Sequence, residues 1–137
     1  MTRWMSLDVG SKKIGIAITD PSKIIARPLT TLFRTTRKAD VQTISQLMNT
    51  HQVDKLIVGM PKHLGGEHSA TLEVIRPLVE DLKTVVKVPI EWAEERLSTK
   101  CAEELMAEVG LSLDERHNKR DEYAAAVILQ WYLEESQ

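Results

Sequence analysis

The sequence predicts a single α/β domain built on a mixed five-stranded sheet flanked by helices. Three strand-like segments follow one another within the first 33 residues, and helical and strand-like segments then alternate along the rest of the chain. A meander of strands followed by alternating elements forms a sheet with both antiparallel and parallel pairs. The 137 residues are enough to bury a core and too few for two ordinary domains, so we expect residues 1–137 to be one domain.

The first half of the chain is expected to supply the meander, one helix and one buried strand. Alternating and apolar stretches mark the strands, and the polar loop Gly10-Ser11-Lys12 suits a hairpin between the first two. A compact apolar run ended by Pro61 is typical of a buried parallel strand. The expected bounds are 3–9, 13–20 and 26–33 for the meander, 39–51 for the helix and 54–61 for the buried strand.

The second half begins with a glycine-containing stretch, 62–68, which has no periodicity and predicts a mobile loop flanking the active site. Beyond it, Ser98 or Thr99 can cap a helix that Gly110 ends. The apolar face of that helix is expected to consist of Ala102, Leu105, Met106 and Val109. The other expected elements are a helix over 69–86, a strand over 88–93 and a last helix over 121–134.

Composition limits the classes of function that fit the chain. The longest uncharged apolar run, Tyr123–Leu133, is too short to span a bilayer, and the first residues lack the apolar core of a signal peptide, so we expect no membrane partner. The lone Cys101 cannot form an internal disulfide, which favours the reducing cytoplasm.

Charge is unevenly distributed along the chain, although its net value is only −2. Residues 1–66 hold 10 Lys and Arg against 4 Asp and Glu, a balance of +6, whereas residues 67–137 hold 8 against 16, a balance of −8. A basic face that contacts phosphates is therefore compatible with an acidic protein.

Three acidic residues, Asp8, Glu95 and Asp121, lie beside apolar segments. We expect Asp8 on the first strand, Glu95 just past the end of the last strand and Asp121 at the start of the last helix, so that all three reach one edge of the sheet. Converging carboxylates need cations to stay charged, and Mg²⁺ or Mn²⁺ prefers such oxygen ligands. Two ions, bridged by Asp8 and each held by one other acid, could activate water and stabilise the leaving oxygen of a phosphodiester.

Each acid also has a plain structural explanation. Taken alone, Asp8 is more often a strand-end carboxylate that caps a loop amide, and Asp121 could simply be the N-cap of its helix. Local pattern cannot choose among Glu91, Glu94 and Glu95.

Four segments in register resemble the YqgF/RuvX family of bacterial RNase H-like nucleases. They are Leu7–Gly15, Ile57–Pro61, Glu94–Thr99 and Asp121–Ala126, and the similarity covers about residues 4–133. The resemblance implies an RNase H-like fold related to Holliday junction resolvases, with the catalytic and metal-binding acids at Asp8, Glu95 and Asp121. It also implies an endonuclease that processes the 5′ end of pre-16S rRNA, a structured RNA, although some relatives resemble resolvases of DNA four-way junctions. The chain departs from the family at Glu94, where Asp is common, and at Lys62-His63, where a more apolar pair is usual.

Six basic residues near these segments are candidates for nucleic-acid binding; the alternative is an ion pair with a nearby acid for Arg96 and a solvated surface position for the others. They are Lys12, Lys13, Lys62, Arg96, Lys119 and Arg120.

Three other functions compete with an RNA nuclease. A Holliday junction resolvase would have to act as a symmetric homodimer, because it places two cuts on a two-fold junction. An ATP-binding actin-like module shares the Asp-x-Gly hairpin but clasps nucleotide between two domains, for which this chain is too short. A non-catalytic RNA-binding assembly factor would keep the fold without the chemistry.

Overall fold

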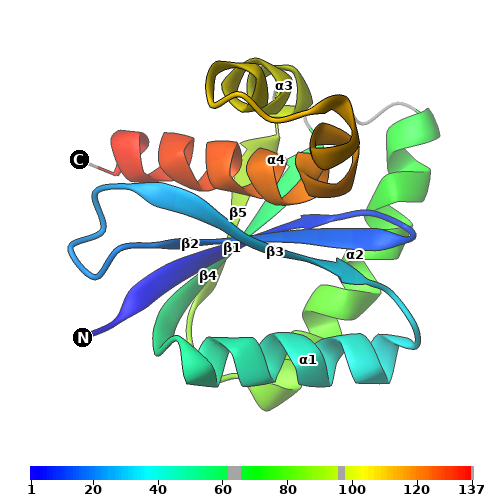
Figure 1. The fold of residues 1–137 in the computed structure, drawn as a ribbon. Coiled ribbons are helices and arrows are strands. Elements are labelled where there is room, and N and C mark those ends of the chain that lie inside the picture. The colour runs from blue at the N-terminus through cyan, green and yellow to red at the C-terminus, as the bar shows by residue number, and fades with distance from the viewer. Residues whose placement is uncertain (62–65, 96–97, 137) are drawn as a thin grey trace.

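The computed structural model describes residues 1–61, 66–95 and 98–136, with side chains described outside 61–72, 95 and 99. Its centre is a five-stranded sheet in the order β3-β2-β1-β4-β5 (Figure 1). The first three strands pair antiparallel, and β4 and β5 add in parallel beside β1, so the predicted mixed sheet is confirmed. The strands are β1 Arg3–Val9, β2 Lys13–Thr19, β3 Ala26–Phe33, β4 Val53–Pro61 and β5 Ile90–Glu95.

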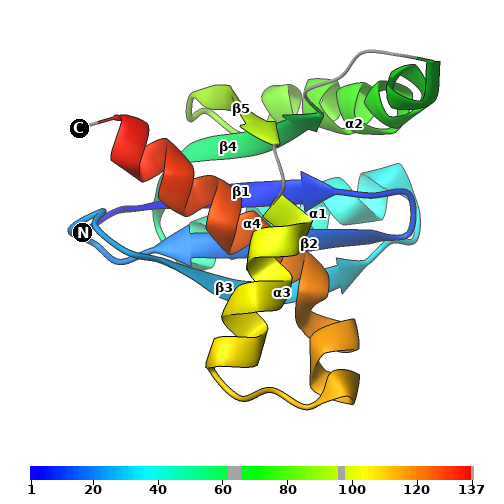
Figure 2. The same cartoon turned by 90° about the horizontal axis from the view of Figure 1, so that it is seen from above.

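Four helices cover the two faces of the sheet, α1 and α2 on one face, α3 and α4 on the other (Figures 1 and 2). None of the helices in the described part of the chain combines the length and apolarity needed to cross a bilayer. The helices are α1 Arg37–Thr50, α2 Gly66–Val85, α3 Ser98–Glu108 and α4 Leu113–Glu135.

The alternation of side chains along β1 divides the core into two layers. Met5, Leu7 and Val9 are buried in the larger cluster beneath α1 and α2. The even-numbered residues of β1 therefore face α4, and there Ala17 of β2 packs with Ala125 in a smaller cluster. A polar residue at an even position of β1 consequently lies between the sheet and α4.

Several predicted boundaries are wrong. The stretch 66–68, expected in a loop, already belongs to α2, since Glu67 and His68 carry no helix-breaking feature. Strand β5 runs two residues later than predicted, because Leu56 N–H donates to the carbonyl of Pro89 and the paired ladder begins only at Ile90. The rest of the predicted mobile loop, 62–65, lies outside the described residues.

The largest error concerns α4, which begins at Leu113 and not at Asp121. Ser112 caps it in a capping box: its Oγ accepts from Glu115 N–H at 3.2 Å, while Glu115 Oε1 accepts from Ser112 N–H at 2.9 Å. The first turns of α4 are exposed to solvent and lack an apolar pattern, so the spacing of apolar residues does not predict them.

The helix α3 is confirmed, but its apolar face is narrower than predicted. Ala102 and Met106 are buried, whereas Leu105 is 36% and Val109 55% exposed. Gly110 ends the helix with a φ of +81°, a conformation that favours glycine.

Candidate active site

Asp8 is the penultimate residue of β1. It is half-buried and lies on the face of the sheet that α4 covers. Two residues earlier on the same face, Ser6 donates from Oγ to the carbonyl of Ala125 at 2.7 Å. In the antiparallel register Asp8 stands directly opposite Gly15 of β2. The position of Asp8 is thus fixed both along β1 and beneath α4.

Asp121 is brought to Asp8 by the close approach of α4 to Gly15. A Cβ atom built on Gly15 would lie 1.9 Å from the carbonyl oxygen of Asp121 and 2.8 Å from the nitrogen of Glu122. Only a residue without a side chain therefore allows α4 to lie this close to β2. The helix runs antiparallel to β1, so that Ala125 lies at Ser6 and Asp121, one turn earlier, lies at the Asp8–Gly15 row.

Asp121 does not open a helix, and its predicted role as an N-cap is wrong, because Ser112 holds that position. It lies in the third turn of α4, half-buried. The three alanines that follow it, Ala124, Ala125 and Ala126, are buried, and their small side chains permit the helix to lie close to the sheet.

Glu95 is the last residue of β5, paired with Pro61 of β4. It lies within the strand, whereas the sequence predicted it just beyond the strand's end. Its side chain is outside the described set, and among the described side chains no group of three or more His, Cys, Asp or Glu is placed to hold a metal. The convergence of all three acids therefore stays a prediction.

The hairpin that follows Asp8 is held by a buried ion pair that sequence reasoning missed. Arg34 Nε lies 3.0 Å from Asp40 Oδ2, and the two side chains are 12% and 2% exposed. The same guanidinium donates from Nη1 to the carbonyl of Gly10 at 3.1 Å, and Arg34 N–H donates to the carbonyl of Lys12 at 2.9 Å. The side chain of Arg34 thereby fixes the loop two residues after Asp8.

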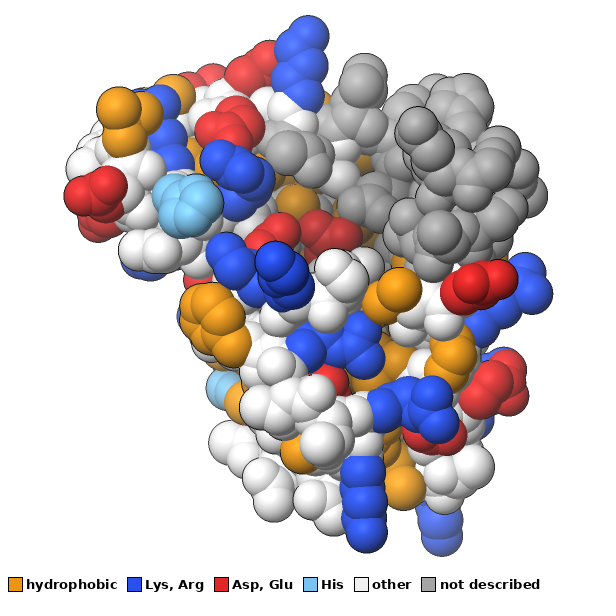
Figure 3. Space-filling view, turned by 90° about the vertical axis from the view of Figure 1, so that its right-hand side faces the viewer, with side chains coloured by type: hydrophobic (Ala, Val, Ile, Leu, Met, Phe, Trp, Pro, Cys, Tyr) orange, Lys and Arg blue, Asp and Glu red, His pale blue; other side chains and the backbone are white. Residues whose placement is uncertain are grey.

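Basic side chains flank the acids at this end of the sheet. Figure 3 shows Asp and Glu side chains there with Lys and Arg side chains around them. Lys12 and Lys119 are exposed, and Lys13 lies 5.6 Å from the centroid of the Phe33 ring. Arg120 pairs instead with Glu103 of α3 at 2.7 Å. The predicted contacts Lys62 and Arg96 lie outside the described residues.

One further carboxylate at this end has a perturbed acidity. Burial raises the pKa of Glu122, an effect partly offset by a hydrogen bond from Thr31 Oγ1 at 3.3 Å and by the charge of Lys119. Lys119 is therefore close to Glu122 on the flank of α4 that faces β3.

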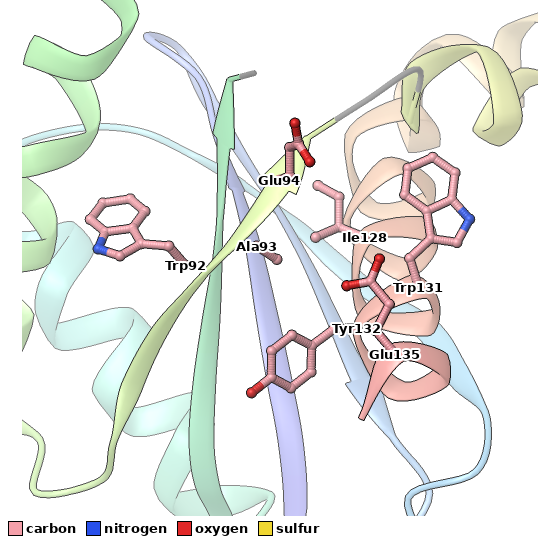
Figure 4. A pocket seen from close by; sticks show the side chains of 7 residues that line it. All are labelled: Trp92, Ala93, Glu94, Ile128, Trp131, Tyr132 and Glu135. Carbon is pink, nitrogen blue, oxygen red and sulfur yellow. The ribbon is translucent and has the colours of Figure 1, made fainter. Parts of the chain in front are cut away.

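A cavity of about 430 Å³ lies between β5 and the C-terminal half of α4 (Figure 4). Ile128 and Tyr132 extend into it from α4, and Trp131, Ala93 and Trp92 also line it, although the Trp92 ring projects to the opposite side of β5. Glu94 and Glu135 complete its lining, and their negative charge disfavours a phosphate backbone. We therefore leave this cavity out of the candidate site.

The order of the strands and the placement of the helices on both faces define an RNase H-like fold. Two solved structures share it: T. thermophilus RuvC in complex with Holliday junction substrate, at a TM-score of 0.61, and the fowlpox virus Holliday junction resolvase, at 0.60. Their sequences are 15% and 13% identical to this chain. Each match covers 98% of this chain, together with 96% of the RuvC chain and 99% of the fowlpox virus resolvase chain. At such identities they show the fold alone.

The family model RuvX, described as Holliday junction resolvase, matches residues 2–135, and the chain belongs to this family. A relative from Thermoanaerobacter pseudethanolicus is 40% identical to this chain, and one from Roseiflexus sp. (strain RS-1) is 35% identical. Both matches cover 96% of this chain, and they cover 96% of the first relative and 94% of the second. Both carry the name "Putative pre-16S rRNA nuclease". The protein is accordingly a nuclease, as the four sequence segments predicted.

Proposed function

We propose that the protein is a divalent-metal-dependent endonuclease that processes the 5′ end of precursor 16S rRNA in the cytoplasm, as a single domain. The names of the relatives support the substrate. The observation that carries the chemistry is the juxtaposition of Asp8 and Asp121, whose backbones meet across Gly15.

We assign Asp8, Glu95 and Asp121 as the acids that hold Mg²⁺ or Mn²⁺, with Asp8 shared between two ions. The donor set fits such ions, because carboxylate oxygens are the ligands that hard divalent cations prefer. Two half-buried carboxylates on facing elements also repel each other unless a cation neutralises them. When bound, these ions supply charge stabilisation for the phosphodiester and make water a better nucleophile.

The described residues around the acids have their own parts in this function. Arg34 keeps the Gly10 loop in place and so limits the movement of Asp8. Lys12, Lys13 and Lys119 attract the phosphate backbone, and we retain Lys62 and Arg96 as candidate contacts. Arg120 would have to give up its ion pair with Glu103 to join them.

Cleavage assays on the purified protein test this proposal. A labelled pre-16S rRNA fragment should be cut with Mn²⁺ or Mg²⁺ and left intact in EDTA. Asp8→Asn, Glu95→Gln and Asp121→Asn should each abolish cleavage and reduce the rise in Tm that Mn²⁺ produces. The matched control is Asp54→Asn, because Asp54 is exposed at the opposite end of the sheet. Wild-type cleavage by Asp8→Asn would contradict the assignment of the acids.

The description of the family model favours a second candidate, a Holliday junction resolvase acting as a homodimer. It predicts paired, symmetric nicks in a labelled four-way DNA junction and a dimer during sedimentation. Symmetric junction cleavage without cleavage of the rRNA fragment would reverse the order of the two proposals. Function in cells that survives Asp8→Asn would instead favour an RNA-binding assembly factor.

A further inference from the structure

Phe33, the only phenylalanine of the chain, ends β3 with 63% of its surface exposed. Large aromatic side chains usually bury most of their area, so an exposed one at a functional face needs an explanation. The residue lies at the same end of the sheet as Asp8, because β2 connects the two through a continuous register.

That register puts Phe33 on the face that carries the acids. Asp8, Gly15 and Thr31 stand side by side across three strands, and Lys13 pairs with Phe33 in the next row outward on the same face. Two strand spacings and two residues of rise separate the Cα atoms of Asp8 and Phe33 by about 12 Å. A short run of nucleotides can bridge this distance.

The immediate surroundings of the ring suit a nucleic-acid strand. The ammonium group of Lys13 lies 5.6 Å from the ring centroid, and 63% of the surface of Phe33 remains exposed. Thr31, two residues before Phe33 on the same face of β3, donates from Oγ1 to the carboxylate of Glu122 in α4 at 3.3 Å. An apolar ring beside a cation offers a stacking surface for a base together with a counter-charge for a neighbouring phosphate.

We propose that Phe33 stacks on an unpaired nucleobase of the strand being cut, while Lys13 contacts a neighbouring phosphate. This inference rests on the proposed nuclease function and adds to it that the substrate has unpaired nucleotides beside the cleavage point. Stacking tolerates any base and either sugar, so the shared ligand chemistry is a single-stranded RNA or DNA segment.

Binding measurements on matched variants test the proposal. Fluorescence anisotropy in EDTA, where no cleavage is expected, would compare a duplex with a single-stranded overhang and the corresponding blunt duplex, each made as RNA and as DNA. Phe33→Ala should weaken overhang binding about tenfold, within the range of base stacking on an aromatic side chain, and leave blunt-duplex binding unchanged. Phe33→Trp should retain overhang binding. The control is Ile25→Ala, since Ile25 is 62% exposed at the far end of the same hairpin.

The role of Lys13 is tested separately, through the salt dependence of binding. Lys13→Gln should lower the dependence of log Kd on log salt concentration by about 0.7 for the single-stranded segment, as expected when one phosphate contact is lost. A 2-aminopurine in the overhang should change its fluorescence on binding to the wild type and not on binding to Phe33→Ala.

The outcomes separate this inference from the function on which it rests. If the wild type cuts RNA or junctions and Phe33→Ala binds the overhang as the wild type does, the stacking proposal is wrong and the nuclease proposal stands. Equal weakening of overhang and blunt duplex would also overturn it, because stacking requires an unpaired base. If the wild type neither binds nor cuts any of the substrates, the proposed function itself fails.

Discussion

Replacing Gly15 by alanine directly perturbs the contact that holds Asp121 against the sheet. The new Cβ would lie 1.9 Å from the Asp121 carbonyl oxygen, whereas ordinary contacts begin at 3.4 Å, so the backbones must separate by about 1.5 Å. Overpacking of this kind costs about 1–3 kcal/mol. With about 2 kcal/mol lost, the Tm should fall by about 7 °C for a domain of this size.

The same displacement should affect activity more than stability. Moving a catalytic group by about 1 Å can lower the rate about 100-fold, so Gly15→Ala should lose most of its Mn²⁺-dependent cleavage at temperatures where it remains folded. Thermal unfolding followed by circular dichroism and cleavage of the rRNA fragment would be measured on the same preparation.

Gly110→Ala provides a control with the same chemical change. Gly110 has open space around its Cα, but its φ of +81° strains any other residue. The variant should lose about 1 kcal/mol through the backbone alone and cut at the wild-type rate. Wild-type activity in Gly15→Ala, or an equal loss in both variants, would refute the idea that the Gly15 contact positions the site.

Three further outcomes follow from other described contacts. Arg34→Met leaves Asp40 buried without its partner, so urea unfolding should show a loss of about 3–5 kcal/mol. Ser112→Ala removes the cap of α4 and should cost about 1 kcal/mol in the same assay. A hydrogen bond from Tyr132, together with Lys55, lowers the pKa of Glu91 in the folded protein. The ionised Glu91 therefore stabilises the fold at pH values above its pKa in the unfolded chain, and this stabilisation is lost as the pH falls through the lower pKa of the folded protein. Stability of Tyr132→Phe should therefore decline less steeply below about pH 4.5 than that of the wild type.

The sheet could be predicted from sequence because its signals are local. The bounds of β3 at Ala26–Phe33 were predicted without error, since alternating apolar residues and turn residues mark them. The order of all elements along the chain was also predicted. Pairing of Glu95 within β5 was missed, because the register with β4, and not the composition of the segment, decides where that strand ends.

The geometry of the site could be predicted only in part. Asp8 and Asp121 were predicted from their motifs, but the close approach of α4 to the strand beside Asp8 depends on Gly15, whose contact partner Asp121 is 106 positions away in the chain. The Arg34–Asp40 pair was missed because a charged residue in a polar segment gives no sign that it is buried. The Ser112–Glu115 capping box was present in the sequence, and only the absence of an apolar pattern after it concealed the start of α4.

The place of α4 in the chain has a consequence for the newly made protein. Every strand of the sheet is synthesised before this helix, yet the cluster around Ala17 and Ala125 cannot close until the helix arrives. Asp121 reaches the sheet in the same event, because Gly15 and Ser6 meet the backbone of α4 around it. On the proposed assignment of the acids, a growing chain on the ribosome would remain inactive towards the RNA that surrounds it until the helix that completes its core has emerged.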